Sequence, residues 1–147
     1  MLNLEFFNRP TNITAKVICD SISEQGVRLT TFEIEYPRFI LAELNTHRQL
    51  SRNSSSSRAI PIQKMLDQIE NNMAMPVYWG KAKSGMQADG EVDEDSVWWY
   101  REKWSFAYDE VSYRVKQLSD LVEGKKEFME ALHKQIPNRL IEPFQMM

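Results

Sequence analysis

The segment from Thr46 to Arg58 most constrains the fold, because it is long, polar and free of helical periodicity. It holds three arginines, one histidine and the serine run Ser54–Ser57. Side chains of this kind form neither the apolar face of a helix nor that of a strand, so the segment is predicted to be a loop. Apolar segments that open at Pro37 and Pro61 flank it, which predicts that two helices hold the loop.

The residues before this Arg/Ser loop (residues 46–58) predict a β-hairpin. Ile13–Ile22 and Val27–Tyr36 are rich in β-branched and apolar side chains, and the turn residues Glu24-Gln25-Gly26 separate them. In the second run, apolar and polar positions alternate as in a half-buried strand. Its more apolar face holds Thr30, Phe32, Ile34 and Tyr36. We therefore expect the sheet to cover a helical layer.

Helical spacing recurs along the rest of the chain. One short helix is expected from Pro37 to His47, which would deliver His47 and Arg48 at its end, and another from Pro61 to Ile69. The segment 75–95, with its Pro and Gly residues, is expected to cross the surface. A long helix is expected over 97–122, with a stop near Gly124, and a further helix over 125–136, interrupted at Pro137.

Length and composition set the class of fold. The chain has 147 residues, of which 42% are hydrophobic, enough for one domain with a core of its own. We found no boundary that would divide it. The prediction is one α+β domain over 1–147, in which a small antiparallel sheet packs against several helices.

Charge and cysteine content exclude some classes. A net charge of -3 argues against nonspecific nucleic-acid binding, which needs a broad basic surface.

No apolar run is long enough to span a membrane, and no signal sequence is evident. The single Cys19 cannot form an internal disulfide and is expected to be a buried strand thiol. The expected location is cytoplasmic.

Several residue groups allow more than one interpretation. The serine run could be a flexible linker. Aromatic residues at the start of the long helix could stack on a base or a flavin, but helical spacing favours a core position. His47 and His133 could be general bases, and neither has metal-ligand spacing, so no metal site is predicted. Acidic residues 91–95 favour a helix start over a cation site.

The chemistry of the Arg/Ser loop favours a phosphate-bearing ligand. Arginine presents a planar fork of N–H donors that matches phosphate oxygens in pairs, and hydroxyl and backbone N–H groups can complete the coordination. Patterns typical of serine hydrolases and of P-loop nucleotide-binding proteins are absent from the sequence.

The loop resembles the signature of the flavin-dependent thymidylate synthases. That signature reads Arg-His-Arg, two variable residues, Ser, one variable, Asn-Glu, one variable, Ser, one variable, Arg. Six positions match at the family's intervals: His47, Arg48, Ser51, Asn53, Ser56 and Arg58. Flanking stretches look similar to a phage and bacterial branch of the family: residues 43–46, 57–61, 79–80, 85–87, 133–135 and 138–144.

The resemblance implies a fold like that of this family and a specific reaction. Family members convert dUMP to dTMP, with methylene-tetrahydrofolate as carbon donor and FAD, reduced by NADPH, as hydride source. They use no enzymic nucleophile on the pyrimidine, so no catalytic side chain is expected. The resemblance implies flavin contacts for His47, Arg48, Asn53 and Ser54, and dUMP contacts for Glu43, Ser54, Ser56, Ser57, Arg58 and Arg139. It also implies a homotetramer with sites at subunit interfaces.

The chain departs from the family pattern at three loop positions. Thr46 replaces an arginine, Ser54 a glutamate and Ala59 a tyrosine. Family members also continue past the position of Phe144 with a strand and a helix. We therefore expect an N-terminal portion, a split-gene product or a shortened relative that a C-terminal chain complements. Two other hypotheses stay open: a non-catalytic nucleotide or flavin-binding module, and an interaction protein that docks on a partner through an exposed end at Gln145-Met146-Met147.

Overall fold

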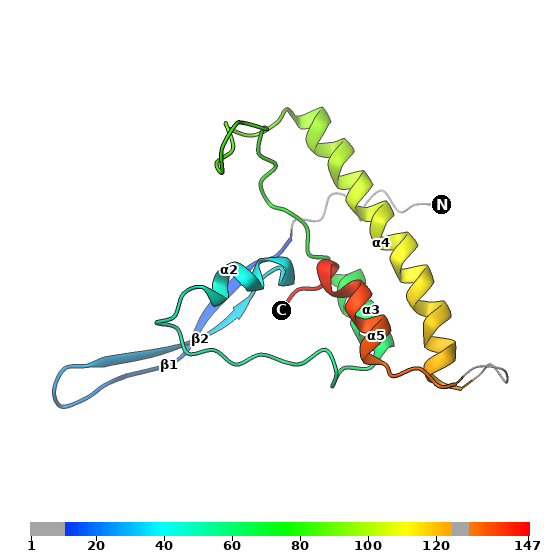
Figure 1. The fold of residues 1–147 in the computed structure, drawn as a ribbon. Helices are drawn as coiled ribbons and strands as arrows, with labels where there is room; N and C mark the ends of the chain where they lie inside the picture. The colour runs from blue at the N-terminus through cyan, green and yellow to red at the C-terminus, as the bar shows by residue number, and fades with distance from the viewer. Residues whose placement is uncertain (1–10, 125–129) are drawn as a thin grey trace.

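The computed structural model describes residues 11–124 and 130–147, which form an α+β arrangement of a two-stranded antiparallel sheet and four α-helices. Figure 1 shows the hairpin projecting from the helical part of the molecule, with the longest helix on the opposite side. The elements in chain order are β1 (Thr14–Ile22), β2 (Arg28–Glu35), the 3-10 turn η1 (Arg38–Ile40), α2 (Leu41–Asn45), α3 (Ile62–Asn71), α4 (Glu94–Val122), α5 (Gln135–Ile141) and the 3-10 turn η2 (Glu142–Phe144).

The hairpin forms as predicted, in antiparallel register. Its turn closes with a hydrogen bond of 2.9 Å from the Gly26 N–H to the Ser23 carbonyl, and Gly26 has a φ of 82°. Glycine adopts this left-handed conformation without the steric cost that a side chain would add. Val17 pairs with Phe32, and a bulge follows in β1.

The expected cover of the sheet is not present, so this part of the prediction is wrong for the chain on its own. Every residue of β1 is exposed, and so are most residues of β2. Cys19, predicted to be buried, is exposed for the same reason. Alternation correctly identified the apolar face, but no helix of the described residues packs over it.

Helices α2 and α3 flank the Arg/Ser loop as predicted. Helix α2 is shorter than expected, because the Thr46 N–H and hydroxyl both donate to the Glu43 carbonyl, at 3.0 and 2.7 Å, and close its last turn. His47 and Arg48 follow directly, as expected. Helix α3 begins after Pro61, and its apolar stripe of Ile62, Met65, Leu66 and Ile69 is buried.

Helix α4 begins at a side-chain cap. Oδ1 of Asp93 accepts the Ser96 N–H at 2.9 Å, and Oδ2 accepts the Ser96 hydroxyl at 2.9 Å. These bonds satisfy part of the free N–H groups of the first turn, which confirms that the acidic segment is a helix start. The bonds from Ser96, the backbone N–H first, hold the pKa of the Asp93 carboxyl below its usual value.

We expect Asp93→Ala to lower the melting temperature at neutral pH. Because the folded-state pKa is lowered, the carboxylate contributes stability above the ordinary value of 3.8 and loses it as the pH falls through the folded-state pKa. The difference in melting temperature between the variant and the wild type should therefore shrink in acid. Calorimetric melts at several acidic pH values measure this difference in melting temperature. Asp95→Ala, the same change two residues further along the chain, serves as the control. An equal effect of both changes would contradict the capping role.

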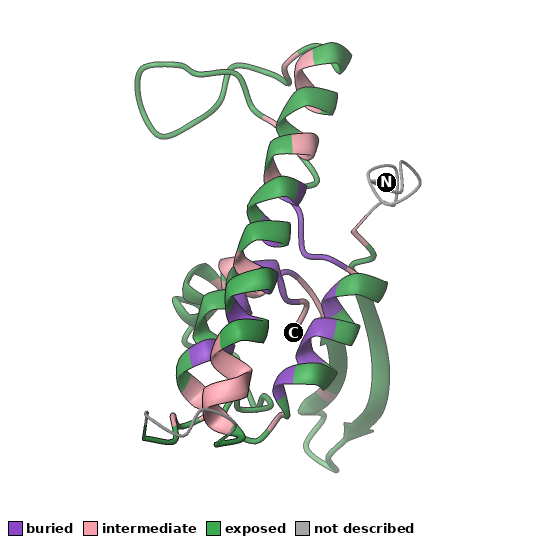
Figure 2. Ribbon diagram, turned by 90° about the vertical axis from the view of Figure 1, so that its right-hand side faces the viewer, coloured by how far each residue is buried: buried purple, intermediate pink, exposed green. Residues whose placement is uncertain are grey.

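The first turns of α4 do not lie in the core. Trp98 and Trp99 are 49% and 50% exposed, and Tyr100 is exposed as well, which overturns the expectation that helical spacing buries them. Only Trp104 of this aromatic group is partly buried, against Phe39 and Phe144. Figure 2 shows the first turns of α4 without buried residues, and the buried residues of this helix, Ser105, Tyr108, Ser112 and Val115, begin in its middle.

The last predicted helix is displaced along the chain. Residues 125–129 lie outside the described residues, 130–133 form no helix, and α5 begins at Gln135 and continues past Pro137. Pro137 is tolerated because it lies in the first turn, where N–H groups have no intrahelical partner to lose.

The core joins α3, α4, α5 and η2. It contains Ile62, Met65, Leu66, Ile69, Met73, Met75, Tyr108, Val115, Ile141 and Phe144. The segment after α3 is bonded to α4 and to η2 through Ala74. The Trp104 indole N–H donates to the Ala74 carbonyl at 3.0 Å, and the Ala74 N–H donates to the Phe144 carbonyl at 2.8 Å.

The last residues dock on their own chain, so the expected exposed end at Gln145-Met146-Met147 is wrong. Tyr36 and Met147 exchange backbone hydrogen bonds of 3.0 and 2.8 Å, and Gln145 is buried. Arg38 and Glu142 form an ion pair of 3.1 Å beside them. In the part of the chain that the structure describes, no helix combines the length and the apolar character that crossing a membrane requires.

Candidate functional site

The Arg/Ser loop runs as an open connection from the end of α2 to the start of α3 (Figure 1). No regular element forms between Ser51 and Ser56. The loop is fixed at its two ends, and each end carries different residues of the predicted site.

The first end is held by Arg52. Its guanidinium donates to the Leu44 carbonyl and, at 3.2 Å, to the Asn45 carbonyl, the last carbonyls of α2. A cation there also interacts favourably with the negative end of the helix dipole. Arg52 therefore has a structural role, although the composition of the loop suggested an anion ligand like its neighbours. The capped turn presents His47 and Arg48, both exposed.

The second end is held by Asn138 of α5. Its amide N–H group, on a fully buried side chain, donates to the Ser57 carbonyl at 2.8 Å and to the Ile60 carbonyl at 2.9 Å. This clamp places α5 against the end of the loop. Ser57 is buried, at 7% exposure, which favours a structural role, whereas Arg58 next to it is exposed.

The clamp also brings Arg139 to the same region of the chain as Arg58. Arg139 follows Asn138 in α5, and Arg58 follows Ser57 in the loop, so the two arginines are adjacent in sequence to the two bonded residues. Both side chains are exposed. Both arginines were predicted to contact dUMP, and each follows one of the two bonded residues in the sequence.

Three arginines of the predicted site have no anionic partner within the described residues. Arg48, Arg58 and Arg139 form none of the ion pairs of the structure. Three arginines outside the site do: Arg28 pairs with Asp20, Arg38 with Glu142 and Arg114 with Glu110. Arg52 and Arg101 form no ion pair among the described residues either, but Arg52 is bonded to the end of α2 and the Nε atom of Arg101 is buried. A guanidinium without a carboxylate partner is free to bind an external anion. Phosphate is an anion that such a guanidinium group can bind through paired N–H donors.

The remaining predicted residues are exposed along the loop and on α2. Glu43 uses its carbonyl to close the last turn of α2. Ser56 bonds within its own turn, where its carbonyl accepts the Ala59 N–H at 2.9 Å. Asn53 and Ser54 are exposed and lie in the irregular stretch between Arg52 and Ser57, the two residues at which the loop is fixed. The structure thus separates the residues into a group that follows α2 and a group beside α5.

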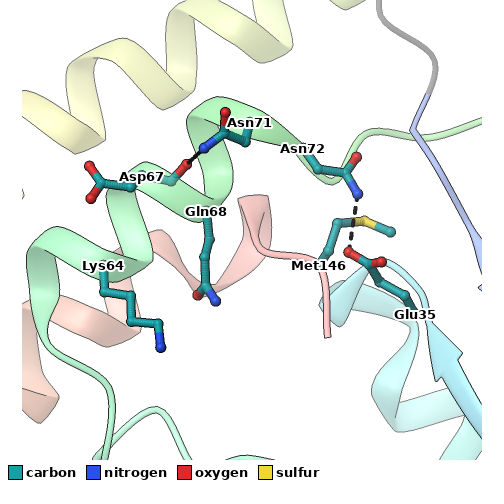
Figure 3. A pocket seen from close by; sticks show the side chains of 7 residues that line it. All are labelled: Glu35, Lys64, Asp67, Gln68, Asn71, Asn72 and Met146. Carbon is teal, nitrogen blue, oxygen red and sulfur yellow. Dashed lines mark hydrogen bonds between the residues drawn. The ribbon is translucent and has the colours of Figure 1, made fainter.

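A cavity of about 320 Å³ lies elsewhere, between α3, the end of β2 and the C-terminal residues (Figure 3). It is lined by Glu35, Lys64, Asp67, Gln68, Asn71, Asn72 and Met146. The Asn72 amide donates to the Glu35 carboxylate at 3.2 Å across it. Its polar groups carry both signs of charge, and none belongs to the predicted site.

Sequence reasoning missed the part that Asn138 plays. Asn138 lies in a stretch that carried the resemblance, but nothing in that stretch distinguishes a buried clamp from a surface amide. Among the described residues, no three His, Cys, Asp or Glu side chains gather where a metal ion could bind. Comparison of the chain with protein-family models, with curated proteins and with solved structures gave no match.

Proposed function

We propose that the Arg/Ser loop binds the phosphate of a pyrimidine nucleotide and of a flavin, and that the chain belongs to an FAD-dependent thymidylate synthase system. The observation that supports it best is the set of exposed guanidinium groups at Arg48, Arg58 and Arg139 that have no carboxylate partner within the described residues. The structural use of Arg52 supports it too, because the resembled signature leaves that position variable.

In this proposal the two ends of the loop serve different ligands. His47 and Arg48, with Asn53 and Ser54, bind FAD. Arg58 and Ser56 bind the dUMP phosphate together with Arg139, while Ser57 and Asn138 hold that end of the loop in place. Bound flavin would supply the redox step between NADPH and the carbon that methylene-tetrahydrofolate donates. The side chains of this chain would bind and orient the reactants.

The proposal includes more than one chain. The loop is open and its two groups of donors lie at separate ends, so one copy offers part of a pocket to each ligand. A homotetramer, or a complementing C-terminal chain, would supply the remaining contacts. This arrangement would retain an α+β fold like that of the resembled family.

Ligand binding tests the proposal directly. We expect saturating dUMP to raise the melting temperature, because a ligand at about 100 times its Kd stabilises the folded state by ~2.7 kcal/mol, or roughly 5–10 °C for a chain of this size. Deoxyuridine, which differs from dUMP only in lacking the phosphate, is the matched control and should shift it little. Purified protein should also show the visible absorption bands of a flavin after incubation with FAD and removal of the excess.

No shift with dUMP and no retained flavin would together contradict the proposed function. A shift with dUMP in a protein that never produces dTMP, even with FAD, NADPH and methylene-tetrahydrofolate, favours the binding-module alternative. The openness of the loop in the single chain is the observation that keeps this second candidate.

A further inference from the structure

The C-terminal residues pair with the chain directly after β2 (Figure 1). Tyr36 and Met147 exchange backbone hydrogen bonds of 3.0 and 2.8 Å. The Arg38 N–H donates to the Gln145 carbonyl at 2.9 Å, and an antiparallel bridge lies between these bonds. The C-terminal residues therefore begin a further antiparallel strand beside the end of β2.

The hydrogen bonds of the hairpin turn show on which edge of β2 this strand begins. The Ser23 N–H donates to the Val27 carbonyl at 2.9 Å, so Val27 bonds towards β1. Backbone groups of successive residues in a strand point to opposite edges, so every second residue after Val27 bonds towards β1 as well. Phe32, Ile34 and Tyr36 lie between those residues and face the other edge, where the C-terminal residues pair.

Beyond Tyr36 this edge of β2 is open. Among the described residues, no backbone hydrogen bond from a segment other than β1 reaches Phe32 or Ile34. These residues are 53% and 44% exposed. The edge is also regular, because the bulge of the hairpin lies in β1. A regular strand with unpaired N–H and C=O groups can pair with another strand, and two strands alone are marginally stable in water.

We propose that this edge binds an extended segment of a different polypeptide, which continues the antiparallel strand that the C-terminal residues begin. The side chains of β2 define the chemistry of that segment. Residues opposite Phe32 and Ile34 lie on the same face as these two side chains and are apolar. Residues opposite Glu33 and Glu35 lie on the other face and are basic, since Glu33 forms no ion pair among the described residues. The partner segment therefore alternates apolar residues with lysine or arginine.

The charges of β2 disfavour a second copy of this chain as the partner. Two antiparallel copies of β2 that pair around Glu33 or Ile34 place glutamates opposite one another, which is destabilising. Pairing around Phe32 brings Arg28 of one copy against Tyr36 of the other, whose backbone groups are already bonded to the C-terminal residues. A basic segment meets neither obstacle.

Hydrogen exchange with a synthetic peptide tests the inference on the unmodified protein. In the protein alone, the amides of Phe32 and Ile34 should exchange faster than those of Thr31 and Glu33, which are bonded to β1. A blocked peptide of alternating valine and lysine should abolish this alternation, because it bonds to the exposed amides. A peptide of alternating valine and glutamate is the matched control and should leave the alternation in place.

Three results of the exchange experiment would overturn the proposal. The first is an alternation that the lysine peptide leaves unchanged, and the second is an equal effect of the two peptides. The third is protection of Phe32 and Ile34 in the protein alone, which would show that the edge is already paired, with a second copy if the protection falls on dilution.

A proline on the open edge tests the same contact by titration. Ile34→Pro removes one N–H donor of the edge and leaves the bonds to β1, so it should weaken binding of the lysine peptide about tenfold or more. Ile34→Ala keeps the N–H and serves as the control for the lost side chain. It should bind the peptide more tightly than Ile34→Pro, and equal affinities of the two variants would contradict the proposal.

The exchange experiment needs no variant, so it decides the case in which Ile34→Pro does not fold. Neither experiment involves dUMP or FAD, so a failure of this inference is separate from a failure of the proposed function.

Discussion

Replacing Arg58 by alanine is expected to weaken dUMP binding about tenfold or more, and to leave FAD binding close to that of the wild type. Hydrogen bonds between a guanidinium and an anion contribute roughly 1.5–3 kcal/mol, and ~1.4 kcal/mol corresponds to a factor of ten. Arg58 has no carboxylate partner among the described residues, so its removal breaks no ion pair of the fold. Isothermal titration with dUMP, and separately with FAD, measures the two affinities.

The matched variants are Arg48→Ala and Arg114→Ala. Arg48 lies at the other end of the loop, and its loss should weaken FAD binding while dUMP binding changes little. Arg114 is bonded to Glu110 on the surface of α4, so its loss controls for the change in net charge. If Arg58→Ala and Arg114→Ala have the same effect on dUMP, or if Arg58→Ala and Arg48→Ala cannot be told apart, the assignment of the two loop ends is wrong.

Local pattern accounts for the elements that the sequence predicted correctly. Helix α3 follows from the spacing of its buried stripe, Ile62 to Ile69, and its start from Pro61. The hairpin follows from its turn at Gly26 and from alternation. These patterns involve residues that are close in the chain, so the elements they predict do not depend on which other elements pack against them.

The failures concern what covers an element. Alternation in β2 identifies Phe32 as a member of the apolar face, but it cannot say whether the cover comes from the same chain. The same limit applies to Trp98 and Trp99, whose helical spacing indicated a core that the described residues do not build around them. The spacing of apolar residues shows which face of one helix or strand is apolar, whereas burial of that face depends on which other elements pack against it.

The candidate site shows the same division. Composition treats the arginines of the loop alike, yet Arg52 closes α2 because the loop turns back on that helix, and Arg58 remains free. The clamp joins Asn138 to Ser57 across 81 residues of sequence. Only the folded path of the chain distinguishes these roles.

That clamp leads to the second large effect: Asn138→Ala should lower the free energy of unfolding by about 2–4 kcal/mol. The variant loses two hydrogen bonds, and the carbonyls of Ser57 and Ile60 lose their side-chain donor. An unsatisfied buried polar group costs ~1–3 kcal/mol, which applies to the Ser57 carbonyl, and the partly buried bond to the Ile60 carbonyl adds to that loss. Urea denaturation measures the change, which should appear as a lower midpoint with an unchanged slope.

Arg139→Ala is the matched control, because Arg139 is the exposed neighbour of Asn138 in α5. Its stability should remain within about 0.5 kcal/mol of the wild type, while its dUMP affinity falls. The two variants therefore distinguish a structural role from a ligand-binding role. Asn138→Ala should lower the free energy of unfolding, whereas Arg139→Ala should lower only the affinity for dUMP. If Asn138→Ala unfolds at the same urea concentration as the wild type, the hydrogen bonds of Asn138 do not hold α5 against Ser57. Arg58 and Arg139 would then have no structural link.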